Sequence, residues 1–476
     1  MNRFFMLTLT LALTLALTGC GWAPMPDGKP ALIIPPGWQM QDTGARYVAH
    51  VPHWWDHFND PQLSSAINQM LVTNNDLAKA GLQLQLARIA AGLTDTNLTP
   101  DVAAGAQTSS DKKLRGGAPT TESYNAAFNL SYELDLWGKL ARAREQSAWL
   151  VNASEQDKQA TALTLIGQTA QLYWEIARLN QQISNQEQSV EIARQTVAFV
   201  DARYLAGAVG QMDTLQAEQS LIGKINRLKD LQEQREEARN AMAILFNRPP
   251  SWRVAQAQTL PENVVVSVPD TLPVEMIAAR PDVQAAEWRL RAALAGSQVA
   301  RLSFYPTLSL SAGLNSGSAL FSQWFSQPAR TLGSTVSLPF LEWNTVRLTV
   351  EKSDIEAKQA EIVFRDAVYQ ALKDVDNAMA QRLNAQSQMD AQARNLTLSQ
   401  QRLVLANEQY AAGAVSFQTL LDAQDALLDG QNALLTQRYN YLNATMQLWL
   451  ALGGERKQSN RGVNFWKRLT FLAGSR

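Results

Sequence analysis

The chain has little of the chemistry on which most metal proteins and many enzymes depend. Among its 476 residues are one cysteine and three histidines. A single cysteine excludes an intrachain disulfide and any site built on several thiolates. The histidines, His50, His53 and His57, lie close together beside Asp56. A metal site there is not favoured, because His50 and His53 flank Pro52 in an extended segment and no helix presents them together.

The chain also has a small net charge and few long apolar runs. The formal charge is −1, and removal of a signal segment leaves it near neutral, so nothing indicates a nucleic-acid partner. After the first twenty residues no apolar run reaches the length of a transmembrane helix, so any membrane crossing would have to use strands. No Gly-rich phosphate loop or Ser-His-Asp set occurs. We therefore expect neither an enzyme, such as a periplasmic hydrolase, nor a cofactor.

The first nineteen residues have the features of a secretory signal. Arg3 supplies a positive charge, an apolar stretch follows, and 17–20 read Leu-Thr-Gly-Cys. These four residues resemble the lipobox of bacterial lipoproteins, which predicts lipidation of Cys20, for example with palmitate, and a stable anchor. Gly21 follows, where an aspartate would resemble an inner-membrane retention signal, so the outer membrane is favoured. An ordinary secretory signal with an incidental cysteine is the alternative.

Most of the remaining chain consists of two similar repeats. Three residues recur 206 positions later: Pro100 as Pro306, Trp137 as Trp343 and Gly207 as Gly413. A constant distance of this kind, which we call the repeat offset, indicates two copies of one structural unit. We expect a lipidated tether over 20–60, a first repeat over 61–248, a linker over 249–273, a second repeat over 274–453 and a tail over 454–476.

Four segments of alternating character predict strands: 98–108, 124–136, 304–314 and 332–340. Alternation gives each strand one apolar and one mostly polar face. Half-buried strands of a soluble sandwich show the same pattern. A membrane barrel is favoured because the second face is rich in Ser, Thr, Asn and Gly, and because aromatic residues gather at the strand ends. These aromatics are Tyr124, Tyr132, Trp137, Phe304, Tyr305, Phe340 and Trp343.

Long helices follow each strand pair. Segments 138–206 and 344–412 contain no proline, and a helix of that length would extend for about 100 Å. In the second, a seven-residue beat typical of coiled coils is interrupted only by Arg382. Its other members are Val368, Val375, Met389, Leu396, Leu403 and Tyr410. Shorter helices over 61–97, 211–248, 274–303 and 417–453 have the combined lengths to stack end to end beside the long ones.

Four strands cannot close a membrane barrel, since the smallest have about eight. Two protomers would supply eight strands around a filled lumen, whereas three protomers would supply twelve strands around an opening. The expected fold is therefore a mixed α+β membrane protein, with four strands per protomer. In it, a trimer forms a twelve-stranded transmembrane β-barrel that continues into a long α-helical coiled-coil barrel.

Six motifs in this order resemble the TolC-type outer membrane factors, most of all the lipoprotein branch that serves RND-type efflux pumps. They lie at 17–20, 54–63 (WWDHFNDPQL), 132–138 (YELDLWG), 280–287 (RPDVQAAE), 304–308 (FYPTL) and 451–454 (ALGG). The resemblance implies a homotrimeric duct in the outer-membrane lipid, joined to a periplasmic adaptor and an inner-membrane pump. The family often has a Gly-rich turn after its fourth strand, where this chain has Glu342, Trp343 and Asn344.

The two glycine-centred turns between long helices are the predicted tips of the tube. Gly207 and Gly413 suit left-handed helix ends. The resemblance implies that the tips dock the adaptor, through Gly207, Ala208 and Val209 in the first and through Gly413, Ala414 and Val415 in the second. As turns alone, they would leave apolar residues exposed without a purpose.

The resemblance also implies a gate. Asp422 matches an aspartate that forms an anionic ring, and Asp213 lies near the corresponding place in the first copy. Three such carboxylates could form a charged constriction, although an acidic residue in the first turn of a helix is favourable anyway. Tyr204 and Tyr410 match tip tyrosines that help to close the entrance. The family's basic partner for them corresponds to Val415, so a closing network here must differ.

We therefore predict a passive exit duct for small toxic compounds, either drugs or metal ions. Protein export is the alternative use of such a duct. A lipid-anchored coiled-coil scaffold without a pore is the alternative from another class, but it would have no need of four alternating strands. The sequence does not name the transported substrate.

Overall fold

The computed structural model describes residues 32–35, 47–48, 53–112, 114–115, 117, 119–261, 268–269 and 280–454. The signal segment, Cys20, His50 and residues 455–476 lie outside the described residues. The chain divides into two compact units, and several helices contribute to both. We call Leu82–Gln156 with Ala285–Asp366 the strand unit, and Ile33–Gly81, Asp157–Gln284 and Ala367–Arg476 the tip unit.

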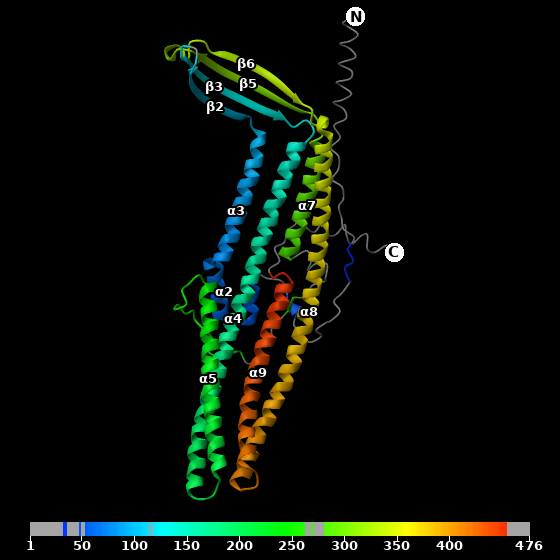
Figure 1. Ribbon diagram of the computed structural model, residues 1–476. Helices are drawn as coiled ribbons and strands as arrows, with labels where there is room; N and C mark the ends of the chain where they lie inside the picture. The colour runs from blue at the N-terminus through cyan, green and yellow to red at the C-terminus, as the bar shows by residue number, and fades with distance from the viewer. Residues whose placement is uncertain are drawn as a thin grey trace. The chain divides into compact units, whose positions relative to one another are not determined.

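The strand unit contains one antiparallel sheet in the order β2-β3-β5-β6 (Figure 1). Its strands are Asp101–Asp111, Thr121–Leu134, Thr307–Ser318 and Ala329–Ser337. All four predicted strands are present, but their ends are shifted. Leu338 and Phe340, predicted to lie in the last strand, lie outside it, because Pro339 cannot donate to the ladder and begins a short 3-10 helix, Pro339–Glu342.

The two hairpins of this sheet have the same register when they are compared at the repeat offset. Val102 pairs with Leu130 in the first hairpin, and Leu308 pairs with Val336 in the second. The central pairing joins the copies and places Leu130 opposite Ala312. Strands β2 and β6 each pair on one side only.

The sheet has the two faces that the alternation predicts. On one face, Asn125 and Asn129 of β3 lie opposite Gly317 and Gly313 of β5. The two glycines leave room for the Asn side chains, because an added Cβ would come within 2.3 Å and 3.1 Å of their oxygens. The other face is apolar and exposed, with Phe128, Leu310, Leu314, Leu332 and Val336 each at least 44% accessible.

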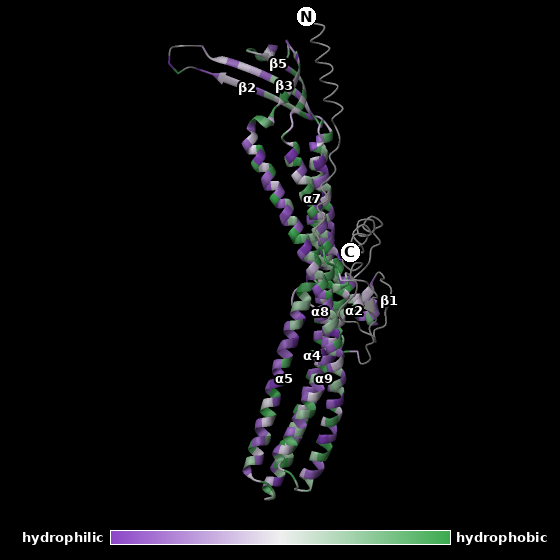
Figure 2. Ribbon diagram, turned by 90° about the vertical axis from the view of Figure 1, so that its right-hand side faces the viewer, coloured by the Kyte–Doolittle hydropathy of each residue, from purple (hydrophilic) through white to green (hydrophobic). Residues whose placement is uncertain are grey.

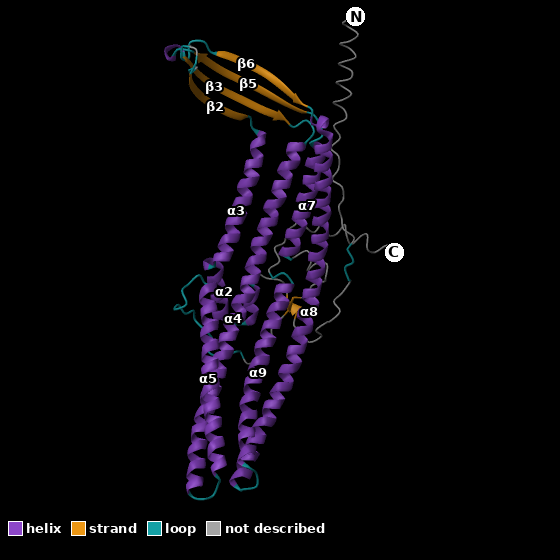
Figure 3. Cartoon of the chain, viewed as in Figure 1, coloured by secondary structure: helices purple, strands orange, loops and turns teal. Residues whose placement is uncertain are grey.

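Two helices of 67 and 69 residues, α4 (Lys139–Leu205) and α8 (Trp343–Ala411), follow the strand pairs (Figure 3). Helices α5 (Gln211–Leu245) and α9 (Phe417–Ala451) return after the two turns. All four agree with the prediction to within three residues. Hydrophilic and hydrophobic residues alternate along them (Figure 2), and in the described part of the chain no helix has both the length and the apolar character to cross a membrane.

The predicted helix over 61–97 is wrong in one respect, because it is broken at Asn74. Helix α2 (Pro61–Thr73) ends there, and α3 (Asn75–Asp95) begins. The Asn74 side chain accepts hydrogen bonds from the backbone N–H groups of Asp76 and Leu77 and so caps α3. In the second copy, α7 spans Pro281–Leu302, and 274–279 of its predicted start lie outside the described residues.

The core of the tip unit is aromatic. Trp54, in the short 3-10 helix Trp54–Phe58, stacks on Trp449 of α9 with ring centroids 5.2 Å apart, and both are fully buried. Phe58 packs on Trp174 of α4 at 5.0 Å. Gly454 completes this core, since an added Cβ would lie 2.5 Å from Leu163.

The turn that leads from the second strand of each hairpin into the long helix differs between the copies. In the first copy Gly138 has a φ of 79° and precedes α4. The corresponding Asn344 already lies inside α8, after the 3-10 turn at Pro339–Glu342. An ordinary right-handed helix start therefore replaces the left-handed glycine at this position.

Candidate functional site at the helical tips

Both tips belong to the tip unit, and each is closed by the same hydrogen-bond pattern. The N–H of Gly207 donates to Tyr204 O at 2.9 Å and that of Ala208 donates to Arg203 O at 2.8 Å. At the second tip, Gly413 and Ala414 donate in the same way to Tyr410 and Gln409. The φ angles of the two glycines are 70° and 74°. These are Schellman ends, and glycine at each αL position avoids the steric cost of a Cβ.

An apolar cluster joins the two tips. Tyr410 of α8 packs on Phe417 of α9 at 5.7 Å, together with Val200 of α4 and Ala217 of α5. Val209 and Val415 pack against its edge. The outward surfaces of the turns are therefore provided by the more exposed Gly207, Ala208, Gly413 and Ala414.

The four predicted gate residues fall into different environments. Tyr410 is 7% exposed, whereas Tyr204, its counterpart in the first copy, is 44% exposed. Asp422 is exposed, and its Oδ1 accepts a hydrogen bond from Gln418 Nε2 at 2.7 Å. Asp213 lies in the first turn of α5, half-buried.

Arg203 is a tip residue that the sequence did not single out. Its guanidinium carbon lies 5.2 Å from the centre of the Tyr410 ring, so it links the first tip to the second. Burial raises the pKa of the Tyr410 hydroxyl, an effect opposed by Arg203 and reinforced by Asp213. The hydroxyl is therefore neutral at physiological pH. No spacing signal could have revealed this pair, because its members are far apart in sequence.

A second link that the sequence missed lies along the same hairpins. Lys224 of α5 forms an ion pair with Asp425 of α9, and the lysine is 8% exposed. The backbone carbonyl of Lys224 accepts a hydrogen bond from Gln186 at 2.9 Å. Its counterpart in the second copy, Gly430, accepts one from Gln392 at 3.4 Å. The helix pairing thus repeats between the copies, while the charge does not.

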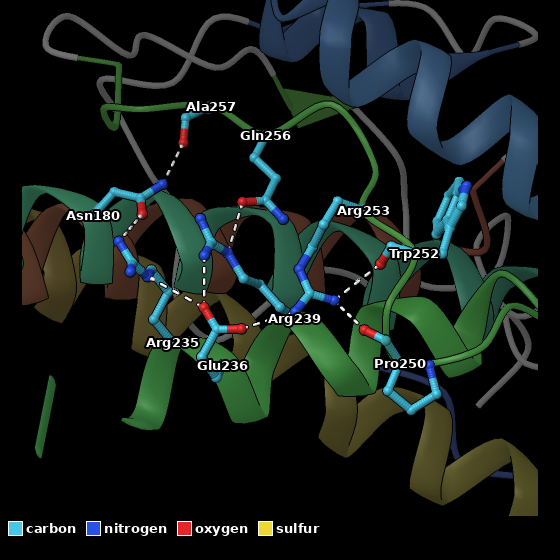
Figure 4. A network of polar contacts seen from close by, with 9 residues as sticks. All are labelled: Asn180, Arg235, Glu236, Arg239, Pro250, Trp252, Arg253, Gln256 and Ala257. Atoms are coloured by element: carbon cyan, nitrogen blue, oxygen red, sulfur yellow. Dashed lines mark hydrogen bonds and ion pairs between the residues drawn. The ribbon is translucent and has the colours of Figure 1, made fainter. Parts of the chain in front are cut away.

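The linker after α5 is held by a polar network (Figure 4). Glu236 pairs with Arg239 at 2.7 Å and with Arg253 at 2.8 Å. Arg239 also donates to Gln256, and Asn180 of α4 donates to Ala257 O at 3.1 Å. Hydrogen bonding from Arg239 holds the pKa of Glu236 below its ordinary value.

The two histidines in the described part of the chain, His53 and His57, contact tryptophans. The His57 ring stacks on Trp449 at 5.4 Å, and the His53 ring lies 5.2 Å from that of Trp55.

Arg382, which interrupts the seven-residue beat, is buried and donates to Tyr441 Oη at 3.0 Å. Val368 and Val375 on the same beat are fully buried, so the beat follows the inward face of α8.

We compared the chain with known proteins. The features to be matched are two repeats with the same hairpin register, a four-stranded sheet and paired helical tips. The family model of outer membrane efflux proteins matches residues 66–248 and 272–454. The chain belongs to the outer membrane efflux protein family. The two matched segments are themselves separated by the repeat offset at both ends.

Relatives cover almost the whole chain. The pyoverdine export outer membrane protein OpmQ of Pseudomonas putida is 30% identical over 93% of this chain and 96% of its own length. The cation efflux system protein CusC of Escherichia coli K12 is 28% identical over 94% and 98%. Solved structures of CusC and of the open state of the Neisseria gonorrhoeae MtrE outer membrane channel both give a TM-score of 0.81. Their identities are 27% and 26%, over 91% and 93% of this chain and 100% of each neighbour.

These similarities place the chain among outer-membrane efflux channels, which are transporters and not enzymes. The fold is that of the TolC-like channels, as the resemblance in the sequence predicted.

Proposed function

We propose that three copies of this chain form a passive duct through the outer membrane. The duct carries small toxic compounds from an inner-membrane pump and a periplasmic adaptor to the outside. The relatives are named for pyoverdine export and for cation efflux, which supports small molecules or metal ions as cargo. Cys20 carries the lipid anchor, and the exposed tip turns meet the adaptor.

One observation supports assembly into a trimer. The two repeats of a protomer contact each other, and the residues that correspond to this contact at the repeat offset are exposed. Within the strand unit, Trp149 of α4 stacks on Trp288 of α7 at 5.0 Å. At the repeat offset, this pair corresponds to Ile355 of α8 and Leu82 of α3. Both are exposed, at 51% and 58%. If the copies follow one another around a ring, Ile355 packs against Leu82 of the neighbouring copy.

Other exposed apolar residues extend the same two surfaces. Leu86, Ile89 and Leu93 continue the stripe on α3 at spacings of three and four residues, and Leu348 and Ile362 continue that on α8 at spacings of seven. Two such stripes match the seams of a coiled coil. A monomer would leave them in water, whereas a ring of copies buries both.

The sheet also has exposed counterparts of a contact between the two repeats, namely its two unpaired edges. Strand β3 pairs with β5, so β6 is expected to pair with β2 of the neighbouring copy in the equivalent register. Leu130 opposite Ala312 then predicts Val336 opposite Ala106 of the neighbouring copy. Closure removes both open edges. Three copies supply twelve strands, with the apolar face toward lipid and the Asn, Ser and Gly face toward the lumen.

Disulfide trapping tests this assembly, because paired strands bring Cα atoms within bonding range. The double variant Val336→Cys with Ala106→Cys should give covalent dimers and trimers on a denaturing gel without reductant. Val336→Cys with Val102→Cys, four residues out of register, is the matched control. The mass of the particle in detergent and its conductance in a planar bilayer complete the test. A monomer without conductance would overturn the proposed function.

A further inference from the structure

The two hairpin loops of the strand unit lie at the end of the sheet remote from the helices (Figure 1), and they differ in charge. No charged residue occurs over 304–329, which includes the loop between β5 and β6. The loop between β2 and β3 contains Lys112, Lys113 and Arg115, of which Lys113 lies outside the described residues. One loop is therefore uncharged and the other is basic.

The uncharged loop packs on a tyrosine at the rim of the apolar face. Tyr124 of β3 lies opposite Ser318, the last residue of β5. The Tyr124 ring contacts Phe321 at 5.5 Å and Trp324 at 5.8 Å between centroids. At this end of the sheet, aromatic side chains thus cover the pairing that joins the two repeats of one protomer.

At the repeat offset, three cations occupy the corresponding positions. Arg330 of β6 corresponds to Tyr124, Lys112 to Ser318, and Arg115 to Phe321. In the proposed barrel β6 pairs with β2 of the neighbouring copy in the equivalent register. Arg330 then lies directly opposite Lys112 of that copy, and the Cβ atoms of residues paired in this way are about 5 Å apart.

Arg330 and Lys112 belong to the apolar face of the sheet. Arg330 pairs with Leu314, which is 55% exposed on that face. Lys112 directly follows β2 and is an even number of residues beyond Val102, another exposed member of the face. Because successive side chains alternate between the faces, the two cations are expected on the same, lipid-facing side of the barrel.

These cations lack a matching anion. All three are exposed, and none of them has an ion pair within the part of the chain that the structure describes. Glu122 is the carboxylate that β3 places on the same face, and it accepts a hydrogen bond from Tyr124 Oη at 2.8 Å. One carboxylate leaves an excess of positive charge. Like charges directly opposite each other in a sheet repel, so an anion between them would stabilise the rim.

We propose that Arg330 of one copy, with Lys112 and Arg115 of the next, binds a phosphate group of a lipid in the outer leaflet. This inference rests on the proposed trimer, because two copies build the site. A phosphate accepts several charge-assisted hydrogen bonds, and the planar guanidinium matches its geometry. A lipid supplies the phosphate, because the cations lie at the rim of the face exposed to lipid, where headgroups begin.

Binding is measured on the full-length protein in a neutral detergent by native mass spectrometry, with diphosphorylated lipid A as the probe. The unmodified trimer should retain lipid A. The double variant Arg330→Gln with Lys112→Gln should bind it about tenfold more weakly, as expected for the loss of charge-assisted hydrogen bonds. Arg227→Gln with Lys229→Gln removes two exposed cations from α5 and is the matched control.

Two further probes identify the bound group. Lipid A without its phosphates should bind the unmodified protein and the double variant Arg330→Gln, Lys112→Gln equally weakly. Inorganic phosphate should displace lipid A only in large excess, because it has no acyl chains to contact the apolar face. Binding that does not depend on the phosphates of lipid A would overturn the proposal. Displacement by inorganic phosphate at the concentration of lipid A would show a free-anion site and overturn the assignment to lipid.

The outcomes also separate this inference from the trimer itself. A particle of trimer mass that binds lipid A equally well in the two double variants overturns the phosphate site and leaves the duct standing. A particle of monomer mass in the unmodified protein overturns both proposals. If the double variant at the rim does not assemble, Lys112→Gln alone, at a position outside the strands, is compared with Lys229→Gln by the same criterion.

Discussion

Asn74 Nδ2 donates a hydrogen bond of 2.7 Å to Leu245 O, and this bond ties the start of α3 to the end of α5. The second copy contains the same tie between different atoms, since Arg280 Nη1 donates to Ala451 O at 3.2 Å. The two donors are separated by the repeat offset, and so are the two acceptors. Short helices therefore meet end to end at equivalent points of both repeats, through a carbonyl that a helix end leaves free.

Replacing Asn74 should loosen this junction. Asn74→Ala removes both the hydrogen bond to Leu245 and the cap of α3, and we expect a loss of about 1–3 kcal/mol of stability. The measurement is thermal unfolding in detergent followed by circular dichroism. Gln83→Ala, at an exposed position of α3, is the control and should change little. An Asn74→Ala protein as stable as the control would show that the junction contributes nothing.

A second prediction concerns two glycines. Gly454 has a φ of 62°, and an added Cβ would approach Leu163 to 2.5 Å and Trp54 Nε1 to 2.9 Å. Gly454→Ala should therefore lower the free energy of unfolding by about 1–3 kcal/mol through backbone strain and overpacking. Gly223→Ala, at an open position inside α5, should raise it by up to about 1 kcal/mol. Melting temperatures that shift in the same direction would contradict this account.

The linker network predicts a dependence on pH. The pKa of Glu236 is lowered in the folded protein from an ordinary value near 4.5, chiefly by the hydrogen bond from Arg239. Its stabilising effect is therefore complete above about pH 4.5 and is lost as the pH falls through the folded-state value. Because the side chain is 45% exposed, the effect should stay below about 1 kcal/mol.

The check for Glu236 is limited proteolysis of the linker at pH 7 and at pH 3.5. Glu236→Gln should raise the cleavage rate near Trp252 at neutral pH, and it should reduce the additional increase on acidification. Glu237→Gln, at the exposed neighbouring position, serves as the control. If both variants respond to acid as the unmodified protein does, Glu236 does not hold the linker.

A fourth prediction concerns the entrance. Asp422 is exposed at the second tip, and three symmetry-related carboxylates would favour cations there. Asp422→Asn should shift the reversal potential in a salt gradient toward that of a non-selective pore. Asp429→Asn removes an exposed carboxylate two turns further along α9 and is the matched control. Equal selectivity of the two variants would remove Asp422 from the gate.

Periodicity predicted most of the secondary structure. The bounds of α4, α5, α8 and α9 follow from helical spacing and the flanking glycines, and the strands follow from alternation. The break at Asn74 was missed because a helix continues through such a residue unless something competes for it. Here, the competitor is Leu245 O, 171 residues away. The strand ends were shifted because partners, and not local propensity, set them.

At the tips, too, some features could be predicted from the sequence and others could not. Gly207 and Gly413 were predictable, because only glycine is at ease in the left-handed turn that ends each long helix. The contact of Arg203 with Tyr410 and the ion pair of Lys224 with Asp425 were not, since each joins residues more than 200 positions apart. The burial of Tyr410, in contrast to the exposure of Tyr204, likewise depends on long-range packing, because Tyr410 belongs to the apolar cluster that residues of both hairpins form.

By itself, the sequence determined the duplication, the order of strands and helices in each copy, and the family to which the chain belongs. These depend on local spacing, which sets the face a side chain occupies on its own element. Only the tertiary structure decided which residues meet between the two hairpins, where Arg203 contacts Tyr410 and Lys224 pairs with Asp425. These contacts arise from long-range packing, because a charge is held only where a distant residue lies close enough to pair with it.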